Sequence, residues 1–277
     1  IPQPSYPLFH FLADLNDVVI DSYPLVYNQG WQIDSNRLKE KLKKEVKAII
    51  LVHPNNPTGS FVKKKELEEI IQIAEDKSLA LISDEVFSDY AFSEEERASS
   101  LAEVKEVLTF TLGGISKTLG LPQMKLAWTL VNGPKKDLEA VLERFEIIHD
   151  TFLSTNIPAQ NALAFWLSQK AEIQEEIKKR IKDNQTFLIN QIASSSISYL
   201  EPEGGWYGIL KLPKTQSEEE WVIQFLEEDH VLIHPGYFFD FEEEGYFVIS
   251  LITEPNPLRD GISRLVRLFK AFSKKTI

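Results

Sequence analysis

The sequence of 277 residues contains no cysteine and no long hydrophobic run. Without cysteine the chain has no disulfide, no iron–sulfur cluster, no Cys-ligated zinc and no thiol nucleophile. The longest uninterrupted apolar run covers residues 162–167 and is far too short to span a bilayer. None of the five histidines has the HExxH or paired spacing of metal ligands, so we expect no metal site.

Basic residues are in the minority, with 30 Lys and Arg against 42 Asp and Glu and a net charge of −12. Binding to a phosphate backbone needs clustered Lys and Arg, and the short basic clusters of this chain have acidic neighbours. No signal peptide is visible. We therefore expect a soluble, cytoplasmic protein whose partners include neither nucleic acid nor a membrane.

Hydrophobic patterning divides the chain at about residue 134. Before that point, runs rich in Val, Ile and Leu alternate with amphipathic stretches, at residues 17–20, 47–52, 79–83, 107–112 and 126–131. After it, two long helical patterns (134–150 and 158–187) precede strand-like pieces at 196–200, 206–212, 230–233 and 246–252, and then a final helix. We predict an α/β large domain with a mostly parallel sheet over 1–134, linking helices over 135–190, and a small α+β domain over 191–277.

Three polar segments each follow a strand-like run, where open α/β sheets place their ligands. They are residues 53–59 (HPNNPTG), 83–87 (SDEVF) and 113–122 (GGISKTLGLP). Taken alone, the first is a common turn, Asp84 is equally a helix cap or a ligand contact, and Lys117 is a solvated surface lysine. A buried lysine would instead have a depressed pKa and could form a Schiff base.

The order and spacing of these segments resemble the class I/II aminotransferases, fold-type I enzymes that use pyridoxal 5'-phosphate (PLP). The resemblance covers essentially the whole chain and also includes Pro-Ser-Tyr at 4–6, Glu-Gly-Gly-Trp-Tyr at 203–207 and His-Pro-Gly at 234–236. It implies a transaminase acting on a small-molecule amino donor and an oxo-acid acceptor, PLP as the cofactor, and a homodimer. The family has a further segment before the Pro-Ser-Tyr match, so we expect this chain to be incomplete at its N-terminus.

The resemblance also implies a role for individual residues. Lys117 would hold PLP as an aldimine and move the substrate α-proton as a general acid and base. Asp84 would keep the pyridine nitrogen protonated, and Asn56 would donate a hydrogen bond to the ring's 3-oxygen. Tyr6 would stack on the ring. Its alternative role is that of an ordinary aromatic residue of the core. Ser116 and Lys125 would hold the phosphate, and the bond before Pro57 would be cis.

Three departures from the family pattern bear on the site. Phe87 stands where a tyrosine usually bonds the 3-oxygen, and Tyr90 is a neighbour in sequence that could replace it. Lys125 stands where the family usually has arginine, which replaces a bidentate fork with a point charge. Val248 stands where an arginine usually clamps the substrate carboxylate, and a valine side chain cannot bind a carboxylate.

These departures leave alternatives open. The substrate carboxylate could be held from elsewhere or by backbone donors, or the substrate could differ from a standard α-amino acid. Other fold-type I PLP enzymes, such as carbon–sulfur β-lyases and decarboxylases, share the motifs because the cofactor carries the hard chemistry. A non-catalytic PLP-binding relative is the third reading.

Overall fold

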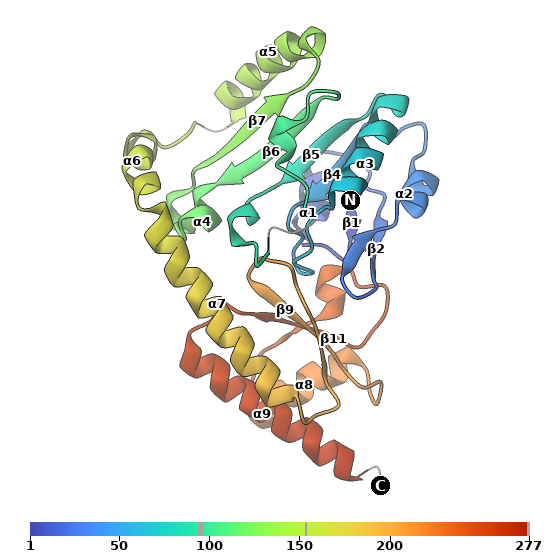
Figure 1. Ribbon diagram of the computed structural model, residues 1–277, viewed down its shortest axis with the longest axis vertical. Coiled ribbons are helices and arrows are strands. Elements are labelled where there is room, and N and C mark those ends of the chain that lie inside the picture. The colour runs from blue at the N-terminus through green and yellow to red at the C-terminus, as the bar shows by residue number, and fades with distance from the viewer. Residues whose placement is uncertain (94–96, 153, 276–277) are drawn as a thin grey trace.

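The computed structural model describes residues 1–93, 97–152 and 154–275 (Figure 1). Two sheet regions lie at opposite ends of an elongated molecule, with the long helices running along one side (Figure 1). Within the described ranges, no helix is long and apolar enough to cross a membrane.

A four-stranded sheet forms the centre of the upper region in Figure 1. Its strands lie in the order β4 (Ala48–Val52), β5 (Ala80–Asp84), β6 (Thr109–Gly114) and β7 (Ala127–Asn132). The first three strands are parallel and β7 is antiparallel to β6, which confirms the mostly parallel sheet expected from the sequence. The parallel strands end at the same edge, so the three polar segments of the sequence meet there.

Helix α3 (Lys64–Lys77) connects β4 to β5 and covers the sheet with a regular apolar face. Leu67, Ile70 and Ala74, which have the i, i+3, i+7 spacing of one helix face, are buried. The shorter helix α2 (Ser35–Lys41) begins after Asp34, because the Asp34 carboxylate accepts hydrogen bonds from two backbone N–H groups of its first turn. The buried face of α3 and the first residue of α2 therefore follow from local features of the sequence.

A second, three-stranded sheet is formed by the N-terminal part of the chain. It contains β1 (Pro2–Gln3), β2 (Tyr23–Tyr27) and β3 (Trp31–Ile33), and α1 (Leu8–Leu15) lies between β1 and β2 in sequence. The strand expected at residues 17–20 is wrong, because residues 4–22 contain no strand. Val18 and Val19 of that run are 56% and 91% exposed. The run therefore has the apolar composition of a buried strand but is not buried.

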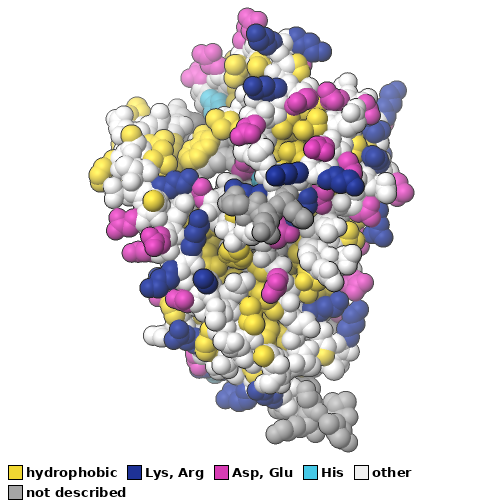
Figure 2. Space-filling view, in the orientation of Figure 1, with side chains coloured by type: hydrophobic (Ala, Val, Ile, Leu, Met, Phe, Trp, Pro, Cys, Tyr) yellow, Lys and Arg dark blue, Asp and Glu magenta, His cyan; other side chains and the backbone are white. Residues whose placement is uncertain are grey.

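Three helices follow the central sheet: α5 (Lys135–Phe152), α6 (Ile157–Ser168) and α7 (Lys170–Ile192). The single helix predicted over 158–187 is two helices, with the break at Gln169. Helix α5 has no buried residue, and Leu142, Ile147 and Ile148 on it are more than half exposed. Figure 2 shows one face of the whole molecule, on which hydrophobic side chains lie between acidic and basic ones.

The lower region contains a four-stranded antiparallel sheet in the order β10 (His234–Pro235), β11 (Tyr246–Ser250), β9 (Tyr207–Lys211) and β8 (Ser198–Leu200). Helices α8 (Glu218–Asp229) and α9 (Pro255–Lys275) accompany it, and α9 runs beside α7 (Figure 1). The strand expected at 230–233 is wrong, because His230 adopts a left-handed conformation that ends α8. The apolar face predicted for the final helix is confirmed by the burial of Leu258, Ile262, Leu265 and Phe269.

Candidate active site

Lys117 lies on α4 (Ile115–Thr118), a single helical turn at the end of β6. The Ile115 N–H donates to the carbonyl of Leu126 at 3.1 Å, which ties the start of this turn to β7. Gly113 must lack a side chain, since a Cβ there would collide with the indole of Trp128. These two contacts hold in place the backbone that leads into Lys117.

Two aromatic rings face the Lys117 amine. Its Nζ lies 5.4 Å from the ring centroid of Phe87 and 5.3 Å from that of Trp206, which are cation–π distances. Burial lowers the pKa of Lys117, and the negative charge of Asp84 opposes this effect. The lysine is thus a half-buried amine with a depressed pKa, in contrast to a solvated surface lysine.

Asp84 ends β5 and supplies the nearest carboxylate that acts on this amine. Its Oδ1 accepts a hydrogen bond from the Val86 N–H at 3.1 Å, as a local cap does. Burial raises the pKa of Asp84, while that hydrogen bond and the positive charge of Lys117 lower it. Asp84 therefore caps the local turn, and its charge also acts on Lys117, while its contact with a ligand stays a prediction.

The loop over residues 53–60 carries Asn56 to the same place. The Asn56–Pro57 bond is cis, as the resemblance implies, and Asn55 holds the turn by accepting a hydrogen bond from the Thr58 hydroxyl at 3.0 Å. A side-chain hydrogen bond joins Asn56 to Tyr207, although burial, the larger effect, raises the pKa of Tyr207. Asn56 is 8% exposed, and its Oδ1 has no partner among the described residues.

The turn at residues 202–205 locks this loop against the lower region. Gly59 has φ of +69°, and a Cβ on it would collide with the Gly204 carbonyl and Pro202. The carboxylate of Glu203 accepts a hydrogen bond from the Phe61 N–H at 2.8 Å and pairs with Lys63. The next two residues after the turn are Trp206 and Tyr207, so the same contact places both aromatic side chains.

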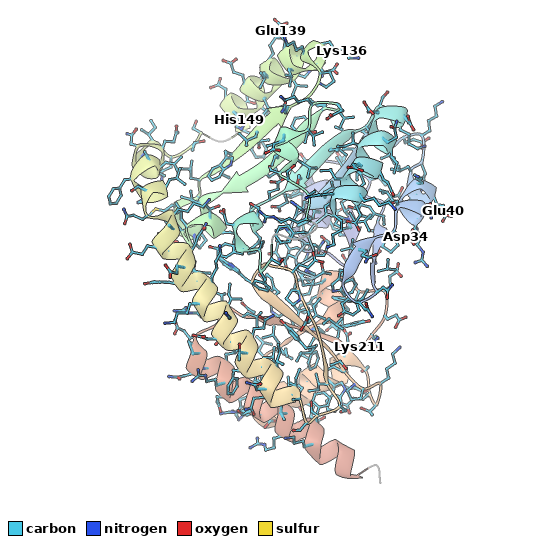
Figure 3. The ribbon with its side chains drawn as sticks, in the orientation of Figure 1. Asp34, Glu40, Lys136, Glu139, His149 and Lys211 are labelled. Atoms are coloured by element: carbon cyan, nitrogen blue, oxygen red, sulfur yellow. The ribbon has the colours of Figure 1, made fainter. Side chains whose placement is uncertain are left out.

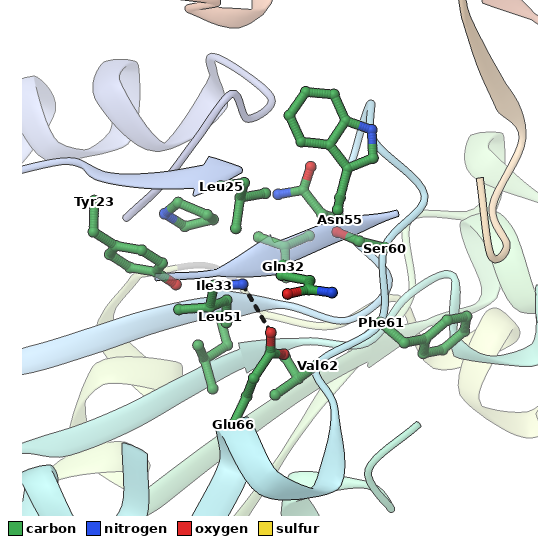
Figure 4. Close-up of a pocket in the computed structure, with 13 residues that line it drawn as sticks. Tyr23, Leu25, Gln32, Ile33, Leu51, Asn55, Ser60, Phe61, Val62 and Glu66 are labelled. Atoms are coloured by element: carbon green, nitrogen blue, oxygen red, sulfur yellow. Dashed lines mark hydrogen bonds between the residues drawn. The ribbon is translucent and has the colours of Figure 1, made fainter. Parts of the chain in front are cut away.

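A small cavity of about 10 Å³ lies behind the Asn56 loop (Figure 4). Glu66 accepts a hydrogen bond from the Ile33 N–H across its floor at 2.8 Å (Figure 4). Asn55 and Trp31 are among the residues that line it, and neither the Asn55 amide nitrogen nor the Trp31 indole nitrogen has an acceptor within the described ranges. A volume of this size holds about one water molecule and is far too small for a substrate, so the cavity belongs to the packing of the loop.

The remaining predicted residues lie around this centre with less contact. Tyr6 is 45% exposed and close enough to Tyr207 to raise the pKa of that residue. Ser116 precedes Lys117 in α4 and is half-buried. Lys125 is exposed in a left-handed turn with φ of +52°, just before β7. The structure thus brings Asn56, Asp84, Phe87 and Lys117 together, with Tyr6 near Tyr207 and Ser116 next to Lys117, while Lys125 lies exposed before β7.

Two aromatic residues of the site, Trp206 and Tyr207, were not singled out from the sequence. The signal was present, because both follow the Gly-Gly turn that the resemblance includes, but the sequence does not show which ring faces the lysine. Tyr90 has a role different from the one considered for it. Its hydroxyl donates to the Lys117 carbonyl at 2.7 Å, so it supports the lysine backbone and does not replace the hydroxyl absent at Phe87.

The groups gathered here fit PLP. An amine in an apolar slot suits the aldehyde, and the carboxylate of Asp84 suits the pyridine nitrogen. The buried Asn56 side chain has an unpartnered oxygen, and turning its amide over would let Tyr207 donate to that oxygen and free the amide N–H groups for the ring's 3-oxygen. For the phosphate, the chain offers the Ser116 hydroxyl and the Lys125 ammonium.

Comparisons with known proteins show the family to which the chain belongs. The family described as "Aminotransferase class I and II" matches residues 1–265. The glutamate-pyruvate aminotransferase AlaA of Escherichia coli K12 is 26% identical over 98% of this chain, which spans 69% of that relative. The alanine aminotransferase of Mycobacterium tuberculosis H37Rv is 24% identical over 96% of the chain, which spans 63% of its length.

Solved structures give the same result for the fold. The alanine aminotransferase of Pyrococcus furiosus superposes with a TM-score of 0.89 at 26% identity, over 98% of this chain and 70% of the other. The tyrosine aminotransferase of Leishmania infantum, at 20% identity, gives 0.87 over 98% of this chain and 68% of the other. The chain therefore belongs to the class I and II aminotransferases, which are PLP-dependent transferases with the type I fold.

Proposed function

We propose that this class I and II aminotransferase moves an amino group between an amino acid and an oxo acid with Lys117 as its reacting side chain. The observation that carries the proposal is the position of the Lys117 amine. It lies against the rings of Phe87 and Trp206, within the influence of the Asp84 charge, at the edge where the parallel strands end. When bound, PLP supplies the aldehyde that accepts the amino group and a conjugated ring that takes up electrons from the reacting carbon.

Lys117 acts as the base and acid at its Nζ atom. Burial lowers its pKa, so a larger fraction of the amine is neutral at a given pH and able to accept a proton. The rings of Phe87 and Trp206, which contact each other, shield the amine from water on the side that faces them. The hydrogen bond from Tyr90 holds the carbonyl of the same residue, so the proton moves at an atom whose backbone is fixed.

Asp84 would hold a proton on the pyridine nitrogen, because its largely buried carboxylate ends β5 and its charge acts on the Lys117 amine. Asn56 and Tyr207 would orient the ring's 3-oxygen, and Tyr6 would cover a ring face. Ser116 and Lys125 would bind the phosphate. Phe87 contributes an apolar wall and no hydrogen bond, which leaves the 3-oxygen to the Asn56–Tyr207 pair.

The amino donor in this reaction is a small α-amino acid. The relatives named for alanine and for glutamate and pyruvate support L-alanine with 2-oxoglutarate as the first pair to assay. A homodimer and a cytoplasmic location remain predictions that follow from the family resemblance.

The test is to add PLP to the purified chain, reduce it with borohydride and map the modified peptide by mass. A pyridoxyl group on Lys117 is expected, and it should be lost together with transaminase activity in Lys117→Ala. Lys136→Ala is the matched control, because this lysine lies on exposed α5, far from the site (Figure 3). A Lys117→Ala protein with full activity would contradict the proposal. Release of pyruvate and ammonia from a β-substituted amino acid without an acceptor would indicate a lyase instead.

A further inference from the structure

Gln174 is a buried polar residue of α7 to which the reaction described above gives no role. The residue is 7% exposed, and its Nε2 atom donates two hydrogen bonds, each 2.9 Å long. One goes to the backbone carbonyl of Thr118, the residue after Lys117, and the other goes to the carboxylate of Asp89. A primary amide has two N–H donors, so both of them are used here. This side chain therefore joins α7 to the turn that carries the reacting amine.

The Thr118 carbonyl is a group that α4 cannot satisfy by itself. Helix α4 ends at Thr118, and the last carbonyls of a helix have no partner within the helix. Gln174 supplies the donor for this carbonyl, as Tyr90 does for the carbonyl of Lys117. Two consecutive carbonyls, one on the reacting residue and one on the next, are thus held by side chains from other parts of the chain.

Apolar contacts seat the same turn on α7 on both sides of Gln174. Ile173 packs against the buried cluster that contains Ile115, the first residue of α4. The Cδ1 atom of Ile177 lies 3.5 Å from the position that a Cβ on Gly120 would occupy, in the turn just after α4. The hydrogen bond from Gln174 therefore lies within a packed contact, where it has a fixed direction.

Asp89 ties a second segment of the site to α7. Its Oδ2 accepts the hydrogen bond from Gln174, and its Oδ1 pairs with the ammonium of Lys170 at 2.7 Å. Asp89 lies in the 3-10 turn Ser88–Tyr90, and the next residue is Tyr90. The two side chains that bind the carbonyls of α4 are thus both anchored to one helix.

The far end of α7 is fixed to the backbone that carries Trp206. Asn184 is fully buried, and its Nδ2 donates to the carbonyls of Leu251 and Thr253, both at 2.8 Å. The Leu251 N–H donates to the Trp206 carbonyl at 2.7 Å, and the Trp206 ring lies 5.3 Å from the Lys117 amine. Helix α7 runs from α4 down to α9 (Figure 1) and so links the backbones of two residues whose side chains meet.

We propose that Gln174 is a positioning residue for Lys117, because its amide fixes the turn that carries the amine to α7 and so sets how the amine meets the Trp206 ring. This inference rests on the proposed function and names a residue that serves the same site. Gln174 acts through the Thr118 carbonyl. Without its donors the turn loses an anchor, the amine takes up a wider range of orientations, and a proton transfer that needs a fixed geometry becomes slower.

The first test is the circular dichroism of the PLP-loaded protein, after removal of free PLP. Because PLP is achiral, its absorption band shows ellipticity only when the protein holds the ring in a fixed orientation. Gln174→Met keeps an unbranched side chain and removes both donors, so the ratio of ellipticity to absorbance is expected to fall. Gln174→Lys retains a donor of similar reach and is expected to keep the wild-type ratio. A wild-type ratio in Gln174→Met, or a fall in a folded Gln174→Lys protein, would overturn the proposal.

Gln185→Met is the matched control, because it makes the same change on the same helix. It breaks the hydrogen bond from Gln185 to the Tyr199 hydroxyl, 3.0 Å long, and so weakens the packing of α7 away from the lysine. Urea denaturation should show a loss of stability in both methionine variants, whereas the ellipticity ratio should fall only in Gln174→Met. An equal fall in both would mean that any weakening of α7 has this effect and would contradict a specific role for Gln174.

The second test separates kcat from KM with L-alanine as the donor. In Gln174→Met, kcat is expected to fall about tenfold, the factor that corresponds to one hydrogen bond lost from the positioning of the amine. The KM should change little, because Gln174 acts on the lysine and not on the bound amino acid. Gln174→Lys should recover most of the rate. A higher KM with an unchanged kcat would contradict the positioning role.

Hydrogen exchange in the protein without PLP tests the anchor independently of the cofactor. Peptides that cover residues 113–122 contain the Leu119 and Leu121 amides, which both donate to the Ile115 carbonyl. These amides should exchange faster in Gln174→Met than in Gln185→Met, because the turn opens locally. If the wild-type protein forms no pyridoxyl adduct on Lys117, the proposed function is wrong, while faster exchange still supports the anchor. If adduct and turnover are present and neither exchange nor ellipticity responds to Gln174→Met, only the assignment of Gln174 is wrong.

Discussion

The hydroxyl of Tyr90 donates a hydrogen bond to the backbone carbonyl of Lys117 at 2.7 Å. Tyr90 is fully buried, in a short 3-10 turn that follows Phe87. Its pKa is raised, mainly by burial and further by the charge of Asp89, so the hydroxyl stays protonated and remains a donor. The contact joins the turn after β5 to the turn after β6, which carry the carboxylate and the amine of the site.

Tyr90→Phe should therefore loosen Lys117 without removing any group that touches the cofactor. Loss of this one hydrogen bond should lower the free energy of unfolding by about 1 kcal/mol, measured by urea denaturation. The yield of pyridoxyl adduct on Lys117 after borohydride reduction should fall as well. Tyr199→Phe is the control, because it breaks a buried hydrogen bond to Gln185 far from the lysine and should change stability alone. Equal adduct yields in both variants would refute the positioning role.

Asp84→Asn should shift the ionisation of Lys117 towards lower pH. The charge of Asp84 raises the lysine pKa against the larger effect of burial, so its removal lets the pKa fall further. The neutral amine then predominates at a lower pH than in the wild type. The rate of Lys117 modification by acetic anhydride against pH, followed by peptide mapping, measures this shift. Asp89→Asn removes a carboxylate that pairs with Lys170 and should leave the profile unchanged.

Gly59→Ala should be strongly destabilising because two penalties coincide. The positive φ of Gly59 disfavours alanine, and a Cβ there would collide with Pro202 and the Gly204 carbonyl. Gly205→Ala separates the two effects, since Gly205 also has a positive φ, +80°, but nothing lies within 4 Å of its Cβ position. We expect a cost of about 1 kcal/mol at Gly205 and about 3 kcal/mol or more at Gly59, measured by chemical denaturation. Equal costs would mean that the interlocking of loop and turn is unimportant.

Much of the fold could be predicted from the sequence, because the central strands and helices follow local rules. The α3 face repeats with helical period, and Asp34 caps α2 through its own side chain. The errors have a common cause. Val18 and Val19 are apolar but exposed, and His230 ends α8 in a left-handed conformation. Neither feature is visible in composition. Burial depends on what packs against a run, which local pattern does not contain.

The site divides in the same way. The nearness of Asp84 and Lys117 could be predicted, because Asp84 ends β5 and Lys117 follows β6, its parallel neighbour, whereas the roles expected for both residues came from the family resemblance. Trp206 and Tyr207 come from the distant turn at 202–205, and only the contact of Gly59 with that turn brings them to the slot. The role of Tyr90 depends on a backbone hydrogen bond that its side-chain type does not specify.

His53 begins the loop that carries Asn56 and is held as a neutral imidazole. It is 2% exposed, its Nδ1 accepts from the Val62 N–H at 2.9 Å, and the backbone of Ala98 forms a second hydrogen bond with the ring. Burial is the largest cause that lowers the pKa of His53 to about 4, and the nearby charges of Arg97 and Lys63 act in the same direction. In the unfolded chain the pKa returns to about 6.5.

The free energy of unfolding should consequently fall as the pH drops from 6.5 to 4. In that interval the unfolded chain binds a proton at His53 that the folded chain does not, so stability is complete above pH 6.5 and lost towards pH 4. The difference corresponds to about 3 kcal/mol. His53→Gln should remove this part of the slope in urea denaturation at a series of pH values, whereas His149→Gln on exposed α5 should retain it. An unchanged slope in His53→Gln would show that the imidazole is already protonated in the folded protein.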